Sequence, residues 1–141
     1  MRSDPRELAE GFSLVLRDLV LLLRQVTAEQ PVSAQQLGIL GSLEAGPRRV
    51  TELAREHGVR APTMTAHVSR LEEVEAVCRG VDTDDARVVT VGLTSRGRDL
   101  LAAGRAARTA FLAERLEALG ESERAALAAA LPVLSRICAG G

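Results

Sequence analysis

One stretch of the chain combines small residues, hydroxyls, an imidazole and arginines, and it holds no carboxylate before Glu72. The residues concerned are Arg60, Thr63, Thr65, Ala66, His67 and Arg70. Met64, Val68 and Leu71 recur at spacings of four and three residues, so they share the buried face of a helix. Hydroxyl, imidazole and guanidinium groups form hydrogen bonds with base edges and phosphates, and small residues allow close approach. The stretch predicts a helix that enters a major groove, and the alternative is an ordinary amphipathic helix.

Two β-favouring runs follow this helix, residues 77–80 and 87–93, and the acidic segment 81–86 between them favours a turn. An arginine at the tip of a hairpin beside such a helix is placed to reach the adjacent minor groove. Arg87 is the candidate, and Asp85, two residues before it, is placed to hold its side chain by a charge-assisted hydrogen bond. The sequence therefore predicts a β-wing with a second DNA contact.

A shorter helix is predicted directly before the first stretch, with Thr51 as its N-cap and Gly58 closing it. Leu53 and Ala54 are its inward pair. The two helices and the turn between them have the order of a helix-turn-helix. Upstream, a helix capped by Ser33 is predicted, and residues 48–50 are a candidate for a minimal third strand beside the wing.

Apolar seams mark helices at both ends of the chain. Residues 5–27 are predicted as one long helix, and a last helix begins near residue 121. The seam residues are Leu8, Phe12, Val15 and Leu19 in the first helix and Leu127, Leu131 and Leu134 in the last. The first helix is apolar over so much of its circumference that burial from more than one side is expected. A second copy of the chain is the favoured partner, and the alternative is the central helix of a monomer.

Composition indicates one domain with an aliphatic core, because the 141 residues are 46% apolar and only 1% aromatic. The net charge is −1, and all 18 basic residues are arginine. Residues 48–98 hold nine arginines and eight acids, or +1, and the remainder carries −2. DNA binding must therefore depend on the local placement of arginines, since the bulk charge gives no attraction.

The sequence carries no motif of an enzyme, a metalloprotein or a membrane protein. Neither a nucleophile with its base nor a phosphate-binding loop or metal motif is present, so no catalytic residue, cofactor or metal ligand is predicted. No signal pattern or membrane-length apolar run is seen. Cys78 and Cys138 match no zinc or disulfide framework, which favours the reducing cytoplasm. Cys78, near the wing, is either a redox sensor that acts through wing position or a small buried hydrophobe.

A series of motifs between residues 32 and 97 occurs in the order and at the spacing of one known family. The motifs are Ser33-Ala34-Gln35-Gln36-Leu37 with Leu40 and Leu43, Thr51-Glu52-Leu53-Ala54, Gly58-Val59, Pro62-Thr63-Met64-Thr65, Arg70-Leu71-Glu72, Asp82 with Asp85 and Arg87, and Leu93-Thr94 with Gly97. This segment resembles the MarR family of winged-helix transcriptional regulators. The flanking helices fall where that family keeps its dimerisation helices.

The resemblance implies a mainly α fold with a small β-wing, in which a winged helix-turn-helix is flanked by N- and C-terminal dimerisation helices. It implies one domain over residues 1–141, with the DNA-binding part at 30–94 and the dimerisation parts at 1–29 and 95–141. The expected protein is a cytoplasmic homodimer that binds a pseudo-palindromic operator in double-stranded DNA, acts as a repressor and is released by a small-molecule effector. By position, the residues that would contact DNA are Arg60, Thr63, Thr65, Ala66, His67, Arg70 and Arg87.

Two residues depart from the family pattern. Glu75 stands where a glycine usually ends the recognition helix, and a left-handed glutamate costs on the order of 1 kcal/mol more than glycine. Ala86 replaces the first of two adjacent wing arginines. With the near-zero net charge, these departures support an alternative function, a winged-helix protein-interaction module that has lost DNA binding. Steep salt dependence of binding to a defined duplex would separate the two functions.

Overall fold

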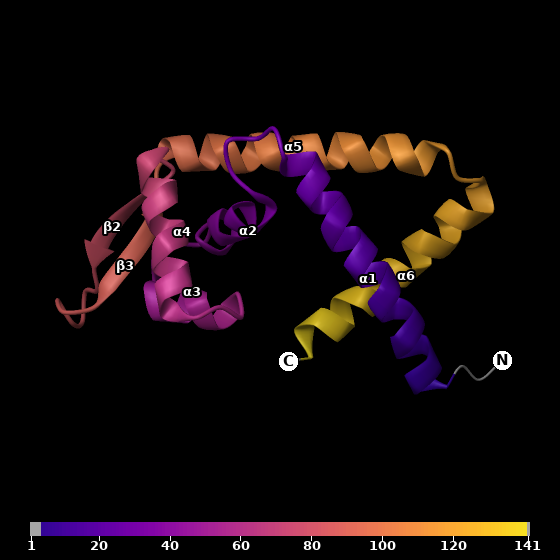
Figure 1. The fold of residues 1–141 in the computed structure, drawn as a ribbon, viewed down its shortest axis with the longest axis horizontal. Coiled ribbons are helices and arrows are strands. Elements are labelled where there is room, and N and C mark those ends of the chain that lie inside the picture. Colours follow the sequence, from indigo (N-terminus) through magenta and orange to yellow (C-terminus); the bar gives the residue numbers. More distant parts are fainter. Residues whose placement is uncertain (1–3, 141) are drawn as a thin grey trace. The chain divides into compact units, whose positions relative to one another are not determined.

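The computed structural model describes residues 4–140, and the chain divides into two compact units, Met1–Arg108 and Thr109–Gly141. Figure 1 shows the order of the elements. They are α1 (Pro5–Thr27), α2 (Ala34–Ser42), β1 (Arg48–Arg49), α3 (Val50–Glu56), α4 (Ala61–Glu73), β2 (Val77–Val81), β3 (Val89–Leu93), α5 (Ser95–Glu117) and α6 (Glu121–Ala139). The first unit contains the elements from α1 to the first part of α5, and the second contains the rest. The mainly α fold with a small β-wing is confirmed.

Helices α2 and α5 begin after residues whose side chains accept hydrogen bonds from the first backbone N–H groups. Ser33 and Gln36 form a reciprocal capping box at α2, with bonds of 3.1 and 3.0 Å. At α5, the Thr94 hydroxyl accepts a bond of 3.0 Å from the N–H of Gly97. The prediction of Thr51 as an N-cap is wrong, because α3 already begins at Val50. The preceding residues are held in β1, so the backbone passes directly from strand to helix.

The wing is an antiparallel sheet in which β3 lies between β1 and β2. In β2 and β3, Val77 pairs with Leu93 at one end and Val81 with Val89 at the other. The predicted third strand is present, since β1 pairs with residues 90–91 of β3. β3 begins at Val89, later than the predicted residue 87, because the tip is closed by a bond of 2.9 Å from the Asp82 N–H to the Val88 carbonyl.

The core of the first unit lies beneath α4. Met64, Val68 and Leu71 are fully buried, as their spacing predicted, and the inward pair of α3, Leu53 and Ala54, is also buried. Side chains from α2, β3 and α5 complete this core, including Leu37, Ile39, Leu40, Leu43, Val91 and Leu101. Burial of one face fixes the rotation of α4 about its own axis, and the opposite face is therefore turned to solvent.

The turn from α4 to β2 contains Glu75 in the left-handed region, with φ of 60°, the one non-glycine residue with positive φ in the described chain. Its N–H donates to the Glu72 carbonyl at 2.9 Å, and the Ala76 N–H donates to the Leu71 carbonyl at 2.8 Å. These are the two bonds of a Schellman motif, so the helix ends as a glycine would end it. The Thr94 hydroxyl donates to the Glu75 carbonyl and fastens the turn to the start of α5.

Replacement of Glu75 by glycine is expected to stabilise the protein by about 1 kcal/mol, since glycine adopts this backbone conformation without a Cβ clash. The measurement is thermal unfolding followed by circular dichroism at a fixed protein concentration. Glu75→Ala is the control, because alanine removes the charge and keeps the Cβ. Equal stabilisation by both substitutions would show that charge, and not backbone strain, is the cause.

Apolar side chains are exposed along the first and last helices. Leu8 in α1 is 64% exposed, and Leu131 in α6 is 56% exposed. Other exposed apolar side chains are Leu14, Val15, Leu16, Leu19, Val20 and Leu21 in α1, and Leu127, Val133 and Ile137 in α6. Phe12 and Leu134, the remaining predicted seam residues, are partly exposed. None of the helices within residues 4–140 has both the length and the apolar character needed to cross a membrane.

Candidate nucleic-acid interface

The polar face of α4 is exposed in the first unit. The exposed residues are Arg60, Thr63, Thr65, Ala66 and Arg70. Arg60 is the N-cap and makes no side-chain capping bond, and Pro62 occupies the first turn, where its missing N–H needs no partner. The structure thus brings the predicted contact residues onto one accessible helix. Their surface has hydroxyls and two guanidinium groups and no carboxylate, which suits the edges of bases and the phosphates of DNA.

His67 differs from the other predicted contact residues of α4, because it is partly buried. Burial lowers the pKa of His67 below its ordinary value, and the positive charge of Arg70 lowers it further. The imidazole is therefore predominantly neutral at pH 7 and has one donor and one acceptor nitrogen. In this state, His67 is suited to a hydrogen bond with a base edge and not to a charge contact with phosphate.

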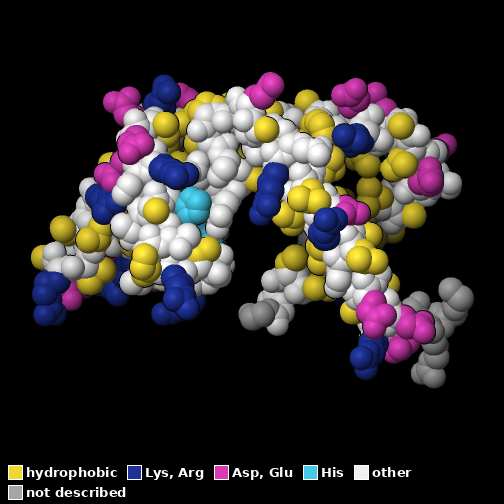
Figure 2. All heavy atoms as spheres, in the orientation of Figure 1, with side chains coloured by type: hydrophobic (Ala, Val, Ile, Leu, Met, Phe, Trp, Pro, Cys, Tyr) yellow, Lys and Arg dark blue, Asp and Glu magenta, His cyan; other side chains and the backbone are white. Residues whose placement is uncertain are grey.

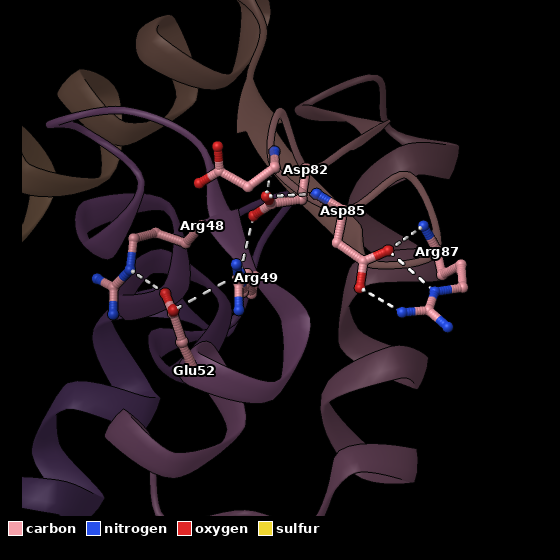
Figure 3. A network of polar contacts seen from close by, with 7 residues as sticks. Arg48, Arg49, Glu52, Asp82, Asp85 and Arg87 are labelled. Carbon is pink, nitrogen blue, oxygen red and sulfur yellow. Dashed lines mark hydrogen bonds and ion pairs between the residues drawn. The ribbon is translucent and has the colours of Figure 1, made fainter.

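Hydrogen bonds that converge on Asp82 order the wing tip (Figure 3). The carboxylate accepts bonds of 2.8 Å from the Arg49 Nε, 2.8 Å from the Asp84 N–H and 3.3 Å from the Asp85 N–H. Its side chain is only 13% exposed. The guanidinium of Arg49 holds the pKa of the Asp82 carboxyl below its ordinary value, and the backbone donors lower the pKa further. Asp82 therefore joins β1 to the wing tip.

Asp85 makes the predicted contact with Arg87 (Figure 3). The Arg87 Nε donates to Asp85 Oδ1 at 3.1 Å and Nη2 donates to Oδ2 at 3.2 Å, while the Arg87 backbone N–H donates to Oδ1 at 3.0 Å. The Arg87 side chain is nevertheless 90% exposed. Asp85 thus orients the guanidinium and leaves it accessible, and its function in DNA binding stays a prediction.

A cleft of about 420 Å³ separates the wing from the first turns of α3 and α4. Its lining consists of Arg49, Val50, Thr51, Ala61, Thr65, Arg79, Arg87, Val88 and Val89. Figure 2 shows basic side chains at the free end of the hairpin, with hydrophobic side chains beside them. Three arginines, from β1, β2 and the wing tip, therefore line one concave surface. Arg49 and Arg79 are paired with Asp82 and Glu72, and Arg87 is the most exposed of the three.

Sequence reasoning missed Arg79, which lies in this cleft. A signal was available, because Arg79 is two residues after the buried Val77 and pairs with the buried Val91. Side chains alternate along a strand, so this register places Arg79 on the face of the sheet toward the core and α4. Strand pairing, and not residue type alone, was needed to find it.

Comparison with known proteins agrees with this geometry. The family model described as "MarR family" matches residues 20–89. An HTH-type transcriptional regulator of Mycobacterium bovis, Mb0904, is 37% identical over 133 residues, which cover 94% of this chain and 92% of the relative. The chain belongs to the MarR family. It is therefore a DNA-binding transcriptional regulator and not an enzyme. The HTH-type transcriptional repressor MdtR of Bacillus subtilis is 33% identical over 67% of this chain and 62% of the relative.

Solved structures of similar fold include a mutant of MarR from E. coli, with a TM-score of 0.82 and 23% identity over 95% of this chain and 98% of that chain. FabT of Streptococcus pneumoniae, solved in complex with DNA, has a TM-score of 0.69 and 18% identity over 97% of this chain and 99% of that chain. At these identities the structures support the winged-helix fold of this MarR-family chain.

Both cysteines of this MarR-family chain are free and exposed. The interpretation of Cys78 as a small buried hydrophobe is therefore wrong, because its position on β2 turns it away from the core. A redox function of Cys78 stays a prediction. Within residues 4–140, no group of three or more His, Cys, Asp or Glu side chains is placed to hold a metal ion.

Proposed function

We propose that this MarR-family protein binds a pseudo-palindromic operator as a homodimer and represses transcription in the cytoplasm. The observation that carries this proposal is the exposed polar face of α4 beside the arginine-lined cleft of the wing. One such module contacts a single major groove and the minor groove next to it. Two modules related by two-fold symmetry would read two half-sites in opposite orientation, which gives operator and protein the same symmetry.

Within each half-site, we assign the base contacts to α4 and the minor-groove contact to the wing tip. The proposed contact residues are Arg60, Thr63, Thr65, Ala66, His67, Arg70 and Arg87. Arg70 carries a guanidinium that suits guanine, and the hydroxyls of Thr63 and Thr65 suit base edges or phosphates. Asp85 supports the wing by orienting Arg87. Ala86 supplies no charge, so Arg87 is the one arginine proposed to contact DNA at the wing tip.

Removal of the wing guanidinium by Arg87→Ala is expected to weaken binding about tenfold on most duplexes, because a minor-groove arginine interacts with the negative potential of the groove. Electrophoretic mobility shift at several salt concentrations measures the loss of affinity. The slope of log K against log[salt] should become shallower by about 0.9, the value for one ionic contact. Arg98→Ala, on α5, is a control that removes the same charge elsewhere. Equal affinities for Arg87→Ala and the unmodified protein would show that Arg87 at the wing tip does not contribute to DNA binding.

The homodimer proposal rests on the exposed apolar side chains of α1 and α6. A soluble monomer rarely exposes so many apolar side chains along a helix, and burial against a second copy would remove them from water. The proposed dimerisation residues are Leu8, Phe12, Val15, Leu19, Leu127, Leu131 and Leu134. The domain assignment follows from this proposal, with residues 30–94 binding DNA and residues 1–29 and 95–141 forming the dimer.

Sedimentation equilibrium is expected to give a mass of about 30 kDa, twice the 15.0 kDa of one chain. Leu8→Glu should shift the protein toward the monomer, because a carboxylate would be buried without a partner in the dimer. Glu10→Gln, on the same helix, is the control and should leave the dimer intact. A 15.0 kDa species at micromolar concentration would contradict the proposal.

Repression is proposed because MdtR, a relative of this chain, is named a repressor.

A small-molecule effector is proposed to bind a cleft of about 320 Å³ between α2, α3 and α5. Leu37 and Leu101 give this cleft an apolar side, and Arg108 gives it a cationic group. The other charged side chains of the lining are paired within the protein, Arg105 with Glu44 and Glu56 with Arg48. Small apolar acids match this combination. Thermal-shift screening of aromatic and aliphatic carboxylates, with Arg108→Ala as the control, tests this site.

The alternative, an interaction module without DNA binding, is tested by the same salt series. A DNA-binding protein loses affinity steeply as salt rises, because binding to phosphates releases counterions. Flat and negligible binding at low salt would favour the interaction module. The Schellman turn at Glu75 argues against this alternative, since it preserves the start of the wing.

A further inference from the structure

Arg79 joins the wing to the recognition helix by two hydrogen bonds. Its Nε donates to Glu72 Oε1 at 2.6 Å, and its Nη2 donates to Ser69 Oγ at 3.0 Å. Both acceptors lie on α4, whereas Arg79 lies in the middle of β2. Bonds to a charged acceptor at such distances are among the stronger polar contacts in proteins. We call this contact the Arg79 bridge.

The Arg79 bridge lies at the edge of α4 that faces the wing. Thr65, Ser69 and Glu72 follow one another at spacings of four and three residues, so they share this edge. Thr65 lines the same cleft as Arg79. Glu72 is therefore the first carboxylate beside the proposed DNA surface, and an unpaired carboxylate there would repel phosphates. Arg79 neutralises this charge.

The other ties of the wing hold its two ends. At the base, the α4–β2 turn is fastened to Thr94, and at the tip Asp82 is bonded to Arg49. Between these ends, the Arg79 bridge is a direct side-chain link from a wing strand to α4. β1 and the buried Val77 and Val91 support the inner part of the sheet. The Arg79 bridge adds a polar contact between α4 and β2, which is the outer strand of the sheet.

We infer that Arg79 is a positioning residue that holds the wing against the recognition helix, so that both enter adjacent grooves of DNA in fixed register. This inference rests on the proposed DNA binding. The Arg79 guanidinium binds two side chains of α4, and the Arg79 side chain is only 36% exposed, compared with 90% for Arg87. Arg79 acts through Glu72 and Ser69, whereas Arg87, which Asp85 orients, is exposed to contact DNA.

The test compares three variants of the protein on a duplex selected by the unmodified protein from a random pool. R79Q removes the bridge and leaves the charge of Glu72 uncompensated. R79Q with E72Q removes the bridge and keeps the summed charge of the pair at zero. R79E with E72R restores an ion pair of reversed polarity. Arg98→Gln on α5 is the control for loss of an arginine elsewhere, and circular dichroism melting checks that every variant folds.

Binding of the neutral double variant is expected to be about tenfold weaker than that of the unmodified protein, with the salt slope unchanged, because no phosphate contact is lost. R79Q alone should bind still more weakly, and the reversed pair should recover most of the affinity. Footprinting supplies a second readout. Protection of guanine N7 in the major groove should persist in the double variant, while hydroxyl-radical protection of the minor groove at the wing should be lost.

A salt slope lower by about 0.9 in the double variant would make Arg79 a direct phosphate contact and overturn the inference. Unchanged affinity and footprint, or a reversed pair no better than the neutral pair, would also overturn it. If a variant fails to fold, Ser69→Ala provides a milder break of the bridge, for which about threefold weaker binding and a fainter wing footprint are expected. Absence of binding by the unmodified protein would instead defeat the proposed function itself.

Discussion

Gly97→Ala is expected to destabilise the protein by about 3 kcal/mol or more, one of the largest effects of any single methyl group in the chain. A Cβ at position 97 would lie 2.0 Å from the Ala76 carbonyl oxygen and 2.9 Å from its carbonyl carbon. These are backbone atoms of the turn between α4 and β2, so no side chain can rotate to make room. The turn or the start of α5 must move.

Movement of the α4–β2 turn would also displace the proposed DNA-binding surface of α4 and the wing. The Ala76 carbonyl accepts a bond of 3.1 Å from the Thr94 N–H, and the Gly97 N–H donates to the Thr94 hydroxyl. Pushing residue 97 away from this turn breaks the link between the end of the recognition helix and α5. Thermal unfolding measures the effect, with a fall in Tm of about 10 °C expected for a chain of this size.

Gly11→Ala is the matched control for this substitution. Nothing lies within 4 Å of a Cβ at Gly11 in α1, and alanine is the better helix former by about 1 kcal/mol. The control should therefore melt at the same temperature as the unmodified protein or higher. Equal melting temperatures of Gly97→Ala and the unmodified protein would show that the close packing at the α4–β2 turn is not as described.

Ala66→Glu is expected to reduce DNA affinity at least about 100-fold without loss of stability. Ala66 is exposed in the middle of α4, and glutamate is a good helix former, so the fold should tolerate the change. In a complex, the new carboxylate would lie against the acceptor-rich floor of a major groove and near phosphates. Like charges brought together at an interface cost several kcal/mol, and the loss of its water shell adds to that cost.

The measurement is binding to the selected duplex, paired with a melting curve. Ala102→Glu on α5 is the control, since Ala102 is also exposed and helical and the net charge of the variant is the same. The control should bind within about twofold of the unmodified protein. If Ala66→Glu also binds normally, α4 is not the helix that enters the groove.

Helices with strong periodicity were predictable from the sequence. The bounds of α1 agree with the predicted residues 5–27. The buried face of α4 follows from apolar spacing, because burial of a helix face requires that spacing. The predicted bond between Asp85 and Arg87 depends on a separation of two residues, so local geometry was sufficient to indicate it. Such features depend on residues close together in the chain.

Features that depend on strand pairing were not predictable in the same way. The error at Thr51 arose because a short strand ends directly where α3 begins, and a capping residue was sought where none was needed. Arg79 was missed because its neighbours on α4 become visible only when the register of β2 and β3 is known. The same applies to Asp82, whose partner Arg49 lies 33 residues earlier in the sequence.

Selection of bound sites from a random pool of duplexes by the purified protein tests the central claim most directly, since it reports DNA binding, symmetry and spacing together. The selected sequences are expected to converge on an inverted repeat whose half-site centres lie about 10 base pairs apart, one turn of the double helix. Failure to enrich any sequence at low salt, or enrichment of an unrepeated single site, would contradict a dimer that presents α4 and its wing twice.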